Sequence, residues 1–445
     1  AMRFPIVLIA ALLAVPAVAE EIRLHGSNTL GAKLAPSLVD AYARSRGYVG
    51  VESVETAALE FEVTGKKGNS EFRGQVRAHG TNTGYADLVS GQADVWMASR
   101  PANQAEIDGA AAIGDLTAAS QEHVIALDGL AIIVHPHNAL ERLDLSGIRD
   151  AFAGRITNWS QLGGPNKPIV LYGRDDKSGT FDSFKSMVLS DGATLSPTTT
   201  RFESSGELEA RVAKDPNALG FVGFSYVKAS KPLAVFAGST LPLKPDSLSV
   251  ATEDYLLARR LYFYTRSDAS QEVLDFIDFV QSEQGQAVVA QTGFVAQNIF
   301  LADADPIPGN PDAYYDVVQG TERLSLNFRF RPQSSTLDSR AMRDVDRLTQ
   351  FMKQPQNRGK QLRLAAFALH GSGAKIMTSL MVNDRVDFLA QVLAVKGVPT
   401  HMSRAFVGGV AVAPLDRPEA RARNERVEVW LFDPSSDVRS GDAAL

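Results

Sequence analysis

Two hydrophobic periods alternate along the front of the chain. Short apolar runs at 22–24, 129–135 and 169–172 have the composition of buried β-strands. Between these runs, apolar residues recur at helical spacing, first at Leu30, Leu34, Leu38 and Tyr42 and later at Phe181, Phe184 and Val188. Strands that alternate with helices predict an α/β architecture with largely parallel sheets.

The back of the chain shows the same two hydrophobic periods over fewer elements. Apolar runs at 324–330, 362–367 and 427–432 predict three strands. Two amphipathic helix faces lie between them, formed by Met342, Val345, Leu348 and Met352 and by Val382, Val386, Leu389 and Leu393. This order predicts a small α+β sandwich.

A segment rich in proline separates the two patterns. Residues 301–311 contain three prolines, a glycine and two aspartates, which is typical of an interdomain linker. A chain of 445 residues also exceeds what one core usually supports. We therefore expect a front domain, a linker, a back domain and a short tail, at 20–302, 303–319, 320–434 and 435–445.

The first residues have the features of an export signal. Arg3 precedes an apolar run at 6–15, and Ala-Val-Ala at 17–19 is a small-x-small cleavage site. The alternative is a buried N-terminal helix. The sequence contains no cysteine, which excludes a disulfide framework and a lipid-anchor thiol. We expect residues 1–19 to be removed and the protein to lie in the periplasm or cell envelope.

Charge is divided unevenly between the two regions. The total is −6, but residues 320–434 hold 18 Lys and Arg against 11 Asp and Glu. An acidic front and a basic back indicate domains with separate partners. The acidic front would repel the phosphates of nucleic acid, so nucleic acid is not expected as a partner.

Three loops of the front region place small and hydroxyl residues at the start of a predicted helix. They are Gly-Ser-Asn-Thr at 26–29, Gly-Thr-Asn-Thr-Gly at 80–84 and Ser-Gly-Thr at 178–180. A helix N-terminus exposes N–H groups and a partial positive charge, so it can hold an anion oxygen. The alternative for any single loop is a helix cap without a ligand.

Two arginines strengthen the anion interpretation. Arg174 lies four residues before Ser178, close enough for a guanidinium and a helix N-terminus to face one tetrahedral anion. Arg100 follows an apolar strand pattern and is a second candidate. For each arginine alone, a surface ion pair is the default interpretation.

Six stretches in a fixed order give the front region a family resemblance. They lie at 26–29, 93–100, 156–164, 174–180, 218–224 and 282–294. Together they resemble the PstS-type phosphate-binding component of phosphate ABC importers over nearly all of residues 20–300. The resemblance implies a two-lobed periplasmic binding protein of type II, with crossover strands near Leu127 and at 261–264. It also implies inorganic phosphate and a phosphate ABC importer as partners.

The resemblance implies that eight residues of this chain correspond to the family's phosphate-binding residues. They are Thr29, Leu30 through its backbone, Thr81, Arg100, Arg174, Ser178, Gly179 and Thr180. Some family members have at position 100 an aspartate that accepts the proton of HPO₄²⁻. This chain has Arg100, so the sequence leaves the proton acceptor unassigned.

The back region resembles the OmpA-like peptidoglycan-binding domain from about 324 to 432. Its ending, Arg-Asn-Glu-Arg-Val-Glu-Val-Trp at 423–430, matches the family. In the family, an aspartate and an arginine fifteen positions apart bind the diaminopimelate of peptidoglycan. Arg385 fits the arginine, but His370 stands in place of the aspartate. The resemblance implies a peptidoglycan site at His370 and Arg385, or a retained fold with reduced binding.

Other chemistry is poorly supported by the sequence. His135 and His137 would share one strand face, but no cysteine or carboxylate accompanies them, so no metal site is expected. Ser178 lacks the G-x-S-x-G setting of a hydrolase, and no enzyme activity or cofactor is expected. The alternatives to import are a wall-associated phosphate scavenger or sensor and a structural wall protein.

Overall fold

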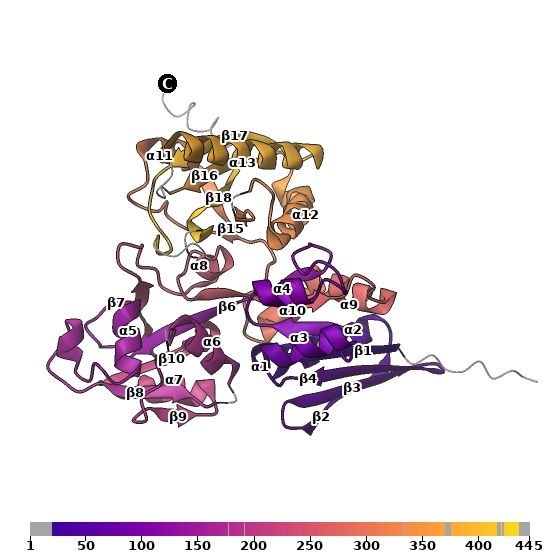
Figure 1. Cartoon of the computed structure of the whole chain (residues 1–445). Coiled ribbons are helices and arrows are strands. Elements are labelled where there is room, and N and C mark those ends of the chain that lie inside the picture. Colours follow the sequence, from indigo (N-terminus) through magenta and orange to yellow (C-terminus); the bar gives the residue numbers. More distant parts are fainter. Residues whose placement is uncertain are drawn as a thin grey trace, which may run out of the picture.

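A computed structural model describes residues 20–176, 178–190, 192–332, 334–369, 375–415, 420 and 422–435. The predicted signal segment 1–19 and His370 lie outside the described residues. Two lobes lie side by side, and the C-terminal domain lies above the strand that joins them (Figure 1). No helix of the described part of the chain is long and apolar enough to cross a bilayer.

Lobe one is formed by the start of the chain and by a later return. Its strands run in the order β2-β3-β4-β1-β5-β13-β6. Its elements are β1 (Glu20–Gly26), α1 (Asn28–Gly31), α2 (Leu34–Ser45), β2 (Val49–Ala57), β3 (Glu60–Lys67), β4 (Ser70–Arg77), α3 (Thr81–Ser90), β5 (Val95–Ala98), α4 (Gln104–Gly109), the first part of β6 (Glu122–Val134), β13 (Ala258–Thr265), α9 (Gln271–Gln281) and α10 (Glu283–Gln291).

Lobe two is inserted between β6 and β13. Its main strands run β6-β10-β8-β9, and a short strand also pairs with β6. Its elements are β7 (Arg142–Asp144), α5 (Leu145–Phe152), η1 (Trp159–Leu162), β8 (Val170–Arg174), α6 (Gly179–Met187), β9 (Thr200–Phe202), α7 (Ser205–Val212), β10 (Ala218–Gly223), η2 (Phe224–Tyr226), β11 (Lys231–Pro232), β12 (Ala234–Phe236) and α8 (Ser247–Ala251).

Both lobes are α/β, but their sheets are mixed rather than largely parallel as expected. β1 pairs parallel with β4 and β5, whereas β2, β3 and β4 form an antiparallel meander. The connections within the meander are too short for a parallel crossover, which needs a dozen or more residues. The predicted helix through Leu30 is also divided into α1 and α2.

Two paired strands join the lobes. Residues 122–129 of β6 pair with β13 in lobe one, and residues 130–134 pair with β10 in lobe two. The predicted crossovers near Leu127 and at 261–264 lie on these two strands. A third link comes from Val295, which exchanges two backbone hydrogen bonds of 2.9 and 2.8 Å with Leu127.

The C-terminal domain is a five-stranded sheet in the order β14-β15-β18-β16-β17. Helices α12 and α13 cover one face of the sheet, and α11 packs on the other. Its elements are β14 (Leu301–Ala302), α11 (Asp312–Val318), β15 (Thr321–Arg329), α12 (Ser339–Lys353), η3 (Pro355–Asn357), β16 (Gln361–Ala368), α13 (Lys375–Val395), β17 (Thr400–Val407), η4 (Ala422–Asn424) and β18 (Arg426–Phe432).

The segment 303–319 is more than the linker that the sequence predicted. It contains α11, whose Tyr314, Val317 and Val318 are buried against the C-terminal sheet. The prolines before this helix concealed its short apolar face. One residue of a predicted helix face also differs, because Met342 of α12 is 45% exposed whereas the rest of that face is buried.

A buried histidine in β6 predicts a pH-dependent stability. The ring of His123 is buried, its Nε2 lies 3.1 Å from Thr265 Oγ1, and burial lowers its pKa to about 3. Below its ordinary pKa of about 6.5, the unfolded chain binds a proton that the folded chain excludes. The free energy of unfolding should therefore fall as pH drops from about 6.5 towards 3, by up to about 1.4 kcal/mol per pH unit.

Urea unfolding at pH values between about 7 and 5 measures this effect, because carboxylates stay largely ionised there. The variant His123→Gln keeps a side-chain N–H but has no titrating ring. Its unfolding free energy should change less over this range than that of the wild type. Parallel slopes for the two proteins would contradict the assignment to His123.

Candidate anion-binding site

A cavity of about 500 Å³ lies where the two lobes meet. We call it the cleft cavity. Its walls come from the start of α1, from the hinge strand β6, and from the loops that precede α6 and α7. Its lining contains the charged residues Lys33, Glu55, Asp128, Arg174, Asp175 and Glu203 and the polar residues Asn28, Thr29, Ser178, Thr180, Ser204, Ser205, Tyr226 and Thr292.

The N-termini of α1 and α6 meet at this cavity. Ser27 and Ser178 are the N-caps, and each side chain accepts a hydrogen bond from a backbone N–H of its own helix. The Thr29 hydroxyl donates to the backbone carbonyl of Gly179 at 3.2 Å across the lobes. A Cβ on Gly179 would lie 2.3 Å from Thr29 Cα, so only glycine permits this approach.

Arg174 brings a positive charge to the same wall. It ends β8, and its guanidinium donates to the carbonyls of Phe202 at 3.3 Å and Glu203 at 2.7 Å and to the hydroxyl of Ser205. These acceptors are neutral, and Arg174 forms no ion pair with a described carboxylate. Burial lowers the pKa of Arg174, but arginine remains protonated near neutral pH. No ion pair therefore neutralises Arg174, although the nearby carboxylates of Asp175 and Glu203 attract its charge.

Five of the eight predicted residues line the cleft cavity, namely Thr29, Arg174, Ser178, Gly179 and Thr180. Leu30 is buried in α1 beside Thr29. Thr81 and Arg100 are not part of the lining. The Thr81 hydroxyl instead lies 3.2 Å from that of Ser99.

Arg100 is engaged by a carboxylate. Its two terminal nitrogens donate to Glu106 at 2.7 and 2.8 Å, and one also donates to Asn82. These bonds raise the pKa of Arg100. Burial opposes the ionisation of Glu106, but the hydrogen bonds from Arg100 and Asn103 outweigh it and lower the pKa of Glu106. In this structure the charge of Arg100 is neutralised outside the cleft cavity.

Sequence reasoning missed a second arginine and its partner. Arg259 of β13 donates to the Thr29 hydroxyl at 3.0 Å and to Asp128 Oδ2 at 3.2 Å. Asp128 also accepts from the Ser183 hydroxyl at 3.0 Å, and it lines the cavity. Burial lowers the pKa of Arg259, and the attraction of Asp128 opposes this shift. Arg259 thus connects the hinge strand to Thr29, one of the predicted phosphate-binding residues.

Arg259 also approaches Thr81 through one intermediate residue. It donates weakly to the Ser99 carbonyl at 3.4 Å, and the Ser99 N–H lies 3.4 Å from the Thr81 hydroxyl. One sequence signal could have indicated Arg259. Two arginines stand together at 259–260 in an otherwise apolar strand, where consecutive side chains point to opposite faces. No group of three or more His, Asp or Glu residues in the described chain could hold a metal ion.

Comparisons with known proteins identify the front region. A PBP superfamily domain matches residues 48–284, which is more than half of the chain. The phosphate-binding protein PstS of Bacillus subtilis is 30% identical over 222 residues, covering 50% of this chain and 70% of that protein. The chain belongs to the PstS-like PBP superfamily. PstS of Borreliella burgdorferi is 28% identical over 228 residues, covering 49% of this chain and 77% of that protein.

A solved structure supports the fold of this PstS-like chain. A possible phosphate-binding protein from Planctomyces limnophilus has a TM-score of 0.52 at 23% identity, covering 63% of this chain and 94% of that one. The α/β fold predicted for the front region is thus confirmed. The relatives are substrate receptors rather than enzymes, as the sequence analysis expected. The PBP match ends at residue 284, before the C-terminal domain.

The buried pair of Arg259 and Asp128 predicts a large loss of stability on truncation. Asp128→Ala leaves the Arg259 guanidinium in the protein interior without its carboxylate. Loss of one partner from a buried pair costs roughly 3–5 kcal/mol. Denaturant unfolding of the full chain measures this cost.

The matched control is Asp268→Ala, which removes an exposed ion pair of 2.8 Å with Arg266. That change should cost less than about 1 kcal/mol. Equal losses in the two variants would show that Asp128 does not compensate a buried charge.

Proposed function

We propose that the cleft cavity captures inorganic phosphate between the two lobes. The observation that carries this proposal is the shared wall of Arg174 and the N-terminus of α6. There, a guanidinium that forms no ion pair with a described carboxylate lies beside a helix start with Ser178 and Thr180. Helix N–H groups, hydroxyls and a guanidinium are the donors that a tetrahedral oxyanion prefers. The PstS relatives support phosphate as that anion.

Asp128 supplies the acceptor that the sequence left unassigned. The hydrogen bonds from Arg259 and Ser183 both reach Oδ2, which leaves Oδ1 for a ligand. A carboxylate at the cavity accepts a hydrogen bond from a protonated oxyanion but repels one that carries no proton. HPO₄²⁻ offers such a proton near neutral pH, and sulfate does not. Asp128 therefore favours phosphate over sulfate.

The bound phosphate is passed to a phosphate ABC importer in the periplasm. This part of the proposal rests on the PstS relatives, of which the chain covers 70% and 77%. The alternative is a phosphate scavenger or sensor that serves no importer. Phosphate uptake by cells that lack this protein separates the two, because only a receptor for an importer changes the uptake rate.

The phosphate site predicts a selective effect of Arg174. Arg174→Ala should weaken phosphate binding by the equivalent of about 2–5 kcal/mol, because it removes a partly buried charge-assisted donor. Arg155→Ala is the matched control in the same lobe, since Arg155 is 61% exposed and pairs with Asp150. Arg155→Ala should leave the affinity almost unchanged.

Isothermal calorimetry of the full chain with phosphate, and then with sulfate at equal concentration, measures both effects. The wild type should bind phosphate and show little response to sulfate. Absence of phosphate binding, equal affinity for sulfate, or equal effects of the two arginine variants would contradict the proposed site.

We propose further that the C-terminal domain is OmpA-like and attaches weakly to peptidoglycan. Arg385 of α13 supports this proposal, because its Nη2 is buried without a hydrogen-bond partner among the described residues. Its Nη1 donates to Glu425 at 2.6 Å, and its Nε donates to the Ser334 carbonyl. Glu425 already neutralises part of the guanidinium charge. A neutral His370 then offers an ammonium ligand no opposing charge.

The histidine at position 370 predicts weak, pH-dependent wall binding. Protonation of His370 at mildly acidic pH would repel the diaminopimelate ammonium and reduce retention. His370→Asp should strengthen binding and flatten this response, because a carboxylate attracts the ammonium at both pH values. Sedimentation of the full chain with purified sacculi at neutral and mildly acidic pH measures the difference.

The matched control is His401→Asp, the same substitution in β17, where the ring of His401 stacks on Phe432. This variant should bind like the wild type. If the wild type binds firmly and His370→Asp changes nothing, then His370 does not lie at the ligand position.

A further inference from the structure

Three consecutive residues at the start of α12 contact both lobes and the strand between them. Asp338, the N-cap, pairs with Arg260 of β13 at 2.8 Å. Ser339 donates its hydroxyl to Glu122, on the lobe one part of β6. The next residue makes the contact with lobe two. The first turn of α12 therefore spans the hinge.

The contact with lobe two is made by Arg340. Arg340 donates to the Glu253 carboxylate at 2.8 Å and to the Ala251 carbonyl at 2.7 Å. Ala251 is the last residue of α8 and belongs to the core of lobe two, and Glu253 follows two residues later. Burial opposes ionisation of Glu253, but Arg260 and Arg340 outweigh it and lower its pKa. This carboxylate is thus held by the hinge strand and by the C-terminal domain together.

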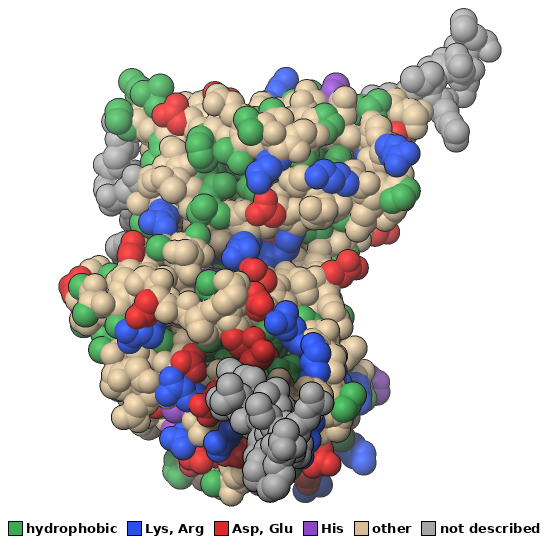
Figure 2. Space-filling view, turned by 90° about the vertical axis from the view of Figure 1, so that its right-hand side faces the viewer, with side chains coloured by type: hydrophobic (Ala, Val, Ile, Leu, Met, Phe, Trp, Pro, Cys, Tyr) green, Lys and Arg blue, Asp and Glu red, His purple; other side chains and the backbone are tan. Residues whose placement is uncertain are grey.

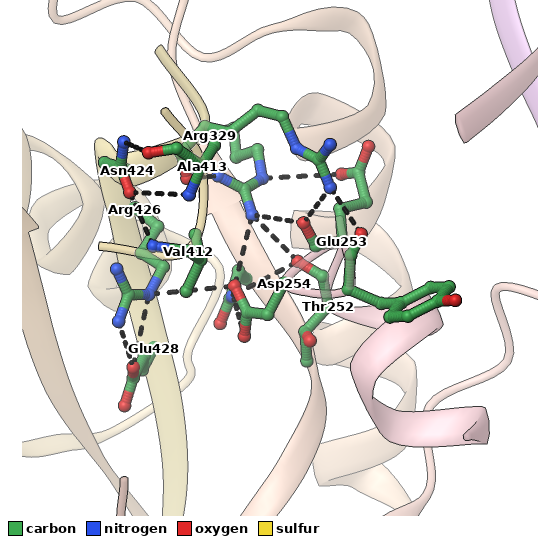
Figure 3. Close-up of polar contacts among 12 residues, drawn as sticks. Thr252, Glu253, Asp254, Arg329, Val412, Ala413, Asn424, Arg426 and Glu428 are labelled. Carbon is green, nitrogen blue, oxygen red and sulfur yellow. Dashed lines mark hydrogen bonds and ion pairs between the residues drawn. The ribbon is translucent and has the colours of Figure 1, made fainter. Parts of the chain in front are cut away.

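The turn at 252–254 joins β15 and β18 of the C-terminal sheet to lobe two (Figure 3). Arg329 of β15 donates to the Thr252 carbonyl at 3.0 Å, and Arg423 donates to the Glu253 carbonyl at 2.7 Å. Asn327 donates to the Asp254 carboxylate at 3.0 Å. Apart from the half-buried Arg423, these residues are buried, so little water competes for the bonds. The domain is fixed on this lobe.

The contacts with lobe one are fewer. Besides those of Asp338 and Ser339, they are made by Arg331, which donates to the Thr117 carbonyl at 2.6 Å, by Arg347, which donates to the Gln297 side chain at 3.3 Å, and by Arg343, which pairs with Asp278 of α9 at 3.9 Å. A polar cavity of about 420 Å³ separates α12 from α9 and α10 nearby. Figure 2 shows the molecule narrowing between the C-terminal domain and the lobes, with charged side chains of both signs there. Docking is thus strong on lobe two and lighter on lobe one.

The hinge strand joins this interface to the cleft cavity. Arg259 and Arg260 are neighbours on β13, so their side chains leave the strand on opposite faces. Arg259 contacts Thr29 and Asp128 at the cavity, whereas Arg260 contacts Asp338 of the C-terminal domain. A shift of the strand that breaks one set of contacts strains the other.

We propose that the first turn of α12 positions the hinge for ligand binding and favours the closed arrangement of the lobes. In this structure the lobes touch at Thr29 and Gly179 while all contacts of Asp338, Ser339 and Arg340 are made. Opening rotates lobe one away from lobe two, and a domain fixed on lobe two then loses Ser339–Glu122. The C-terminal domain thus raises the affinity for phosphate, which rests on the proposed function. Because the linkage is reciprocal, bound phosphate also tightens the docking.

The double variant Asp338→Asn/Ser339→Ala tests this coupling in the full chain. Asparagine caps a helix as well as aspartate does, and alanine is a good helix residue, so α12 is preserved. Arg340 still holds the domain on lobe two. Phosphate affinity in calorimetry should fall by at least about fivefold, with faster release. The single variant Ser339→Thr keeps the hydroxyl and should bind as the wild type does.

Two controls separate positioning from loss of fold. Asp316 of α11 lies on the far side of the C-terminal domain and makes a long, exposed contact of 3.9 Å with Arg404 of β17. Asp316→Asn removes this contact and should leave the phosphate affinity unchanged. The double variant should lose stability, because Arg260 keeps only Glu253 as its carboxylate partner, but it should remain folded, with the circular dichroism spectrum of the wild type. An unchanged phosphate affinity in the double variant would overturn the proposal. An equal loss of phosphate affinity in Asp316→Asn would overturn it too.

A distance measurement tests the positioning without phosphate. The chain has no cysteine, so spin labels can be placed at Glu71→Cys in lobe one and Lys185→Cys in lobe two. The double variant should give a broader and longer distance distribution than the wild type. Identical distributions would overturn the proposal. If the wild type binds no phosphate, the proposed function fails, and this measurement still decides the role of α12.

Discussion

The antiparallel pairing of β6 and β13 is the constraint on which the rest of the structure depends. Both lobes are built on these two strands. The first part of β6 pairs with β13 in lobe one, and the rest of β6 pairs with β10 in lobe two. Asp128, which lines the cleft cavity, stands opposite Arg259 on this pair, in direct register. Glu122 and Arg260 carry the docking of the C-terminal domain. One ladder therefore sets the geometry of the cleft, the hinge and the interface.

Charges rather than apolar surface dominate the contacts around this ladder. Arg259, Arg260, Arg329 and Arg340 are buried or nearly so, and each faces a carboxylate within 3.5 Å. A buried ion pair contributes little net stability compared with a well-packed apolar pair, because desolvation offsets the attraction. Its geometry is directional, however, and a displaced partner is costly. Such contacts suit an interface that must keep one register.

The sequence indicated the architecture better than it indicated the site. Periodicity located β1, β8, β15 and α13 because each has a clear apolar pattern. It missed β17, whose residues are mostly half-exposed, and α11, which follows several prolines. Family motifs placed Ser178 and Arg174 at the cavity wall. Arg259 could not be found in this way, because its role depends on a contact with Thr29 that is 230 residues distant in sequence.

The turn at 252–254 has a consequence for the order in which the molecule is completed. Glu253 has a φ of 61°, which is uncommon for a residue with a side chain. Its partners Arg340 and Arg423 lie 87 and 170 residues later. During synthesis, the front half of the chain emerges with this turn still exposed and its carboxylates in water. The return strand β13 gains its last supports only when Arg423 and β18 are in place, so the front domain is completed only after the C-terminal domain has folded against it.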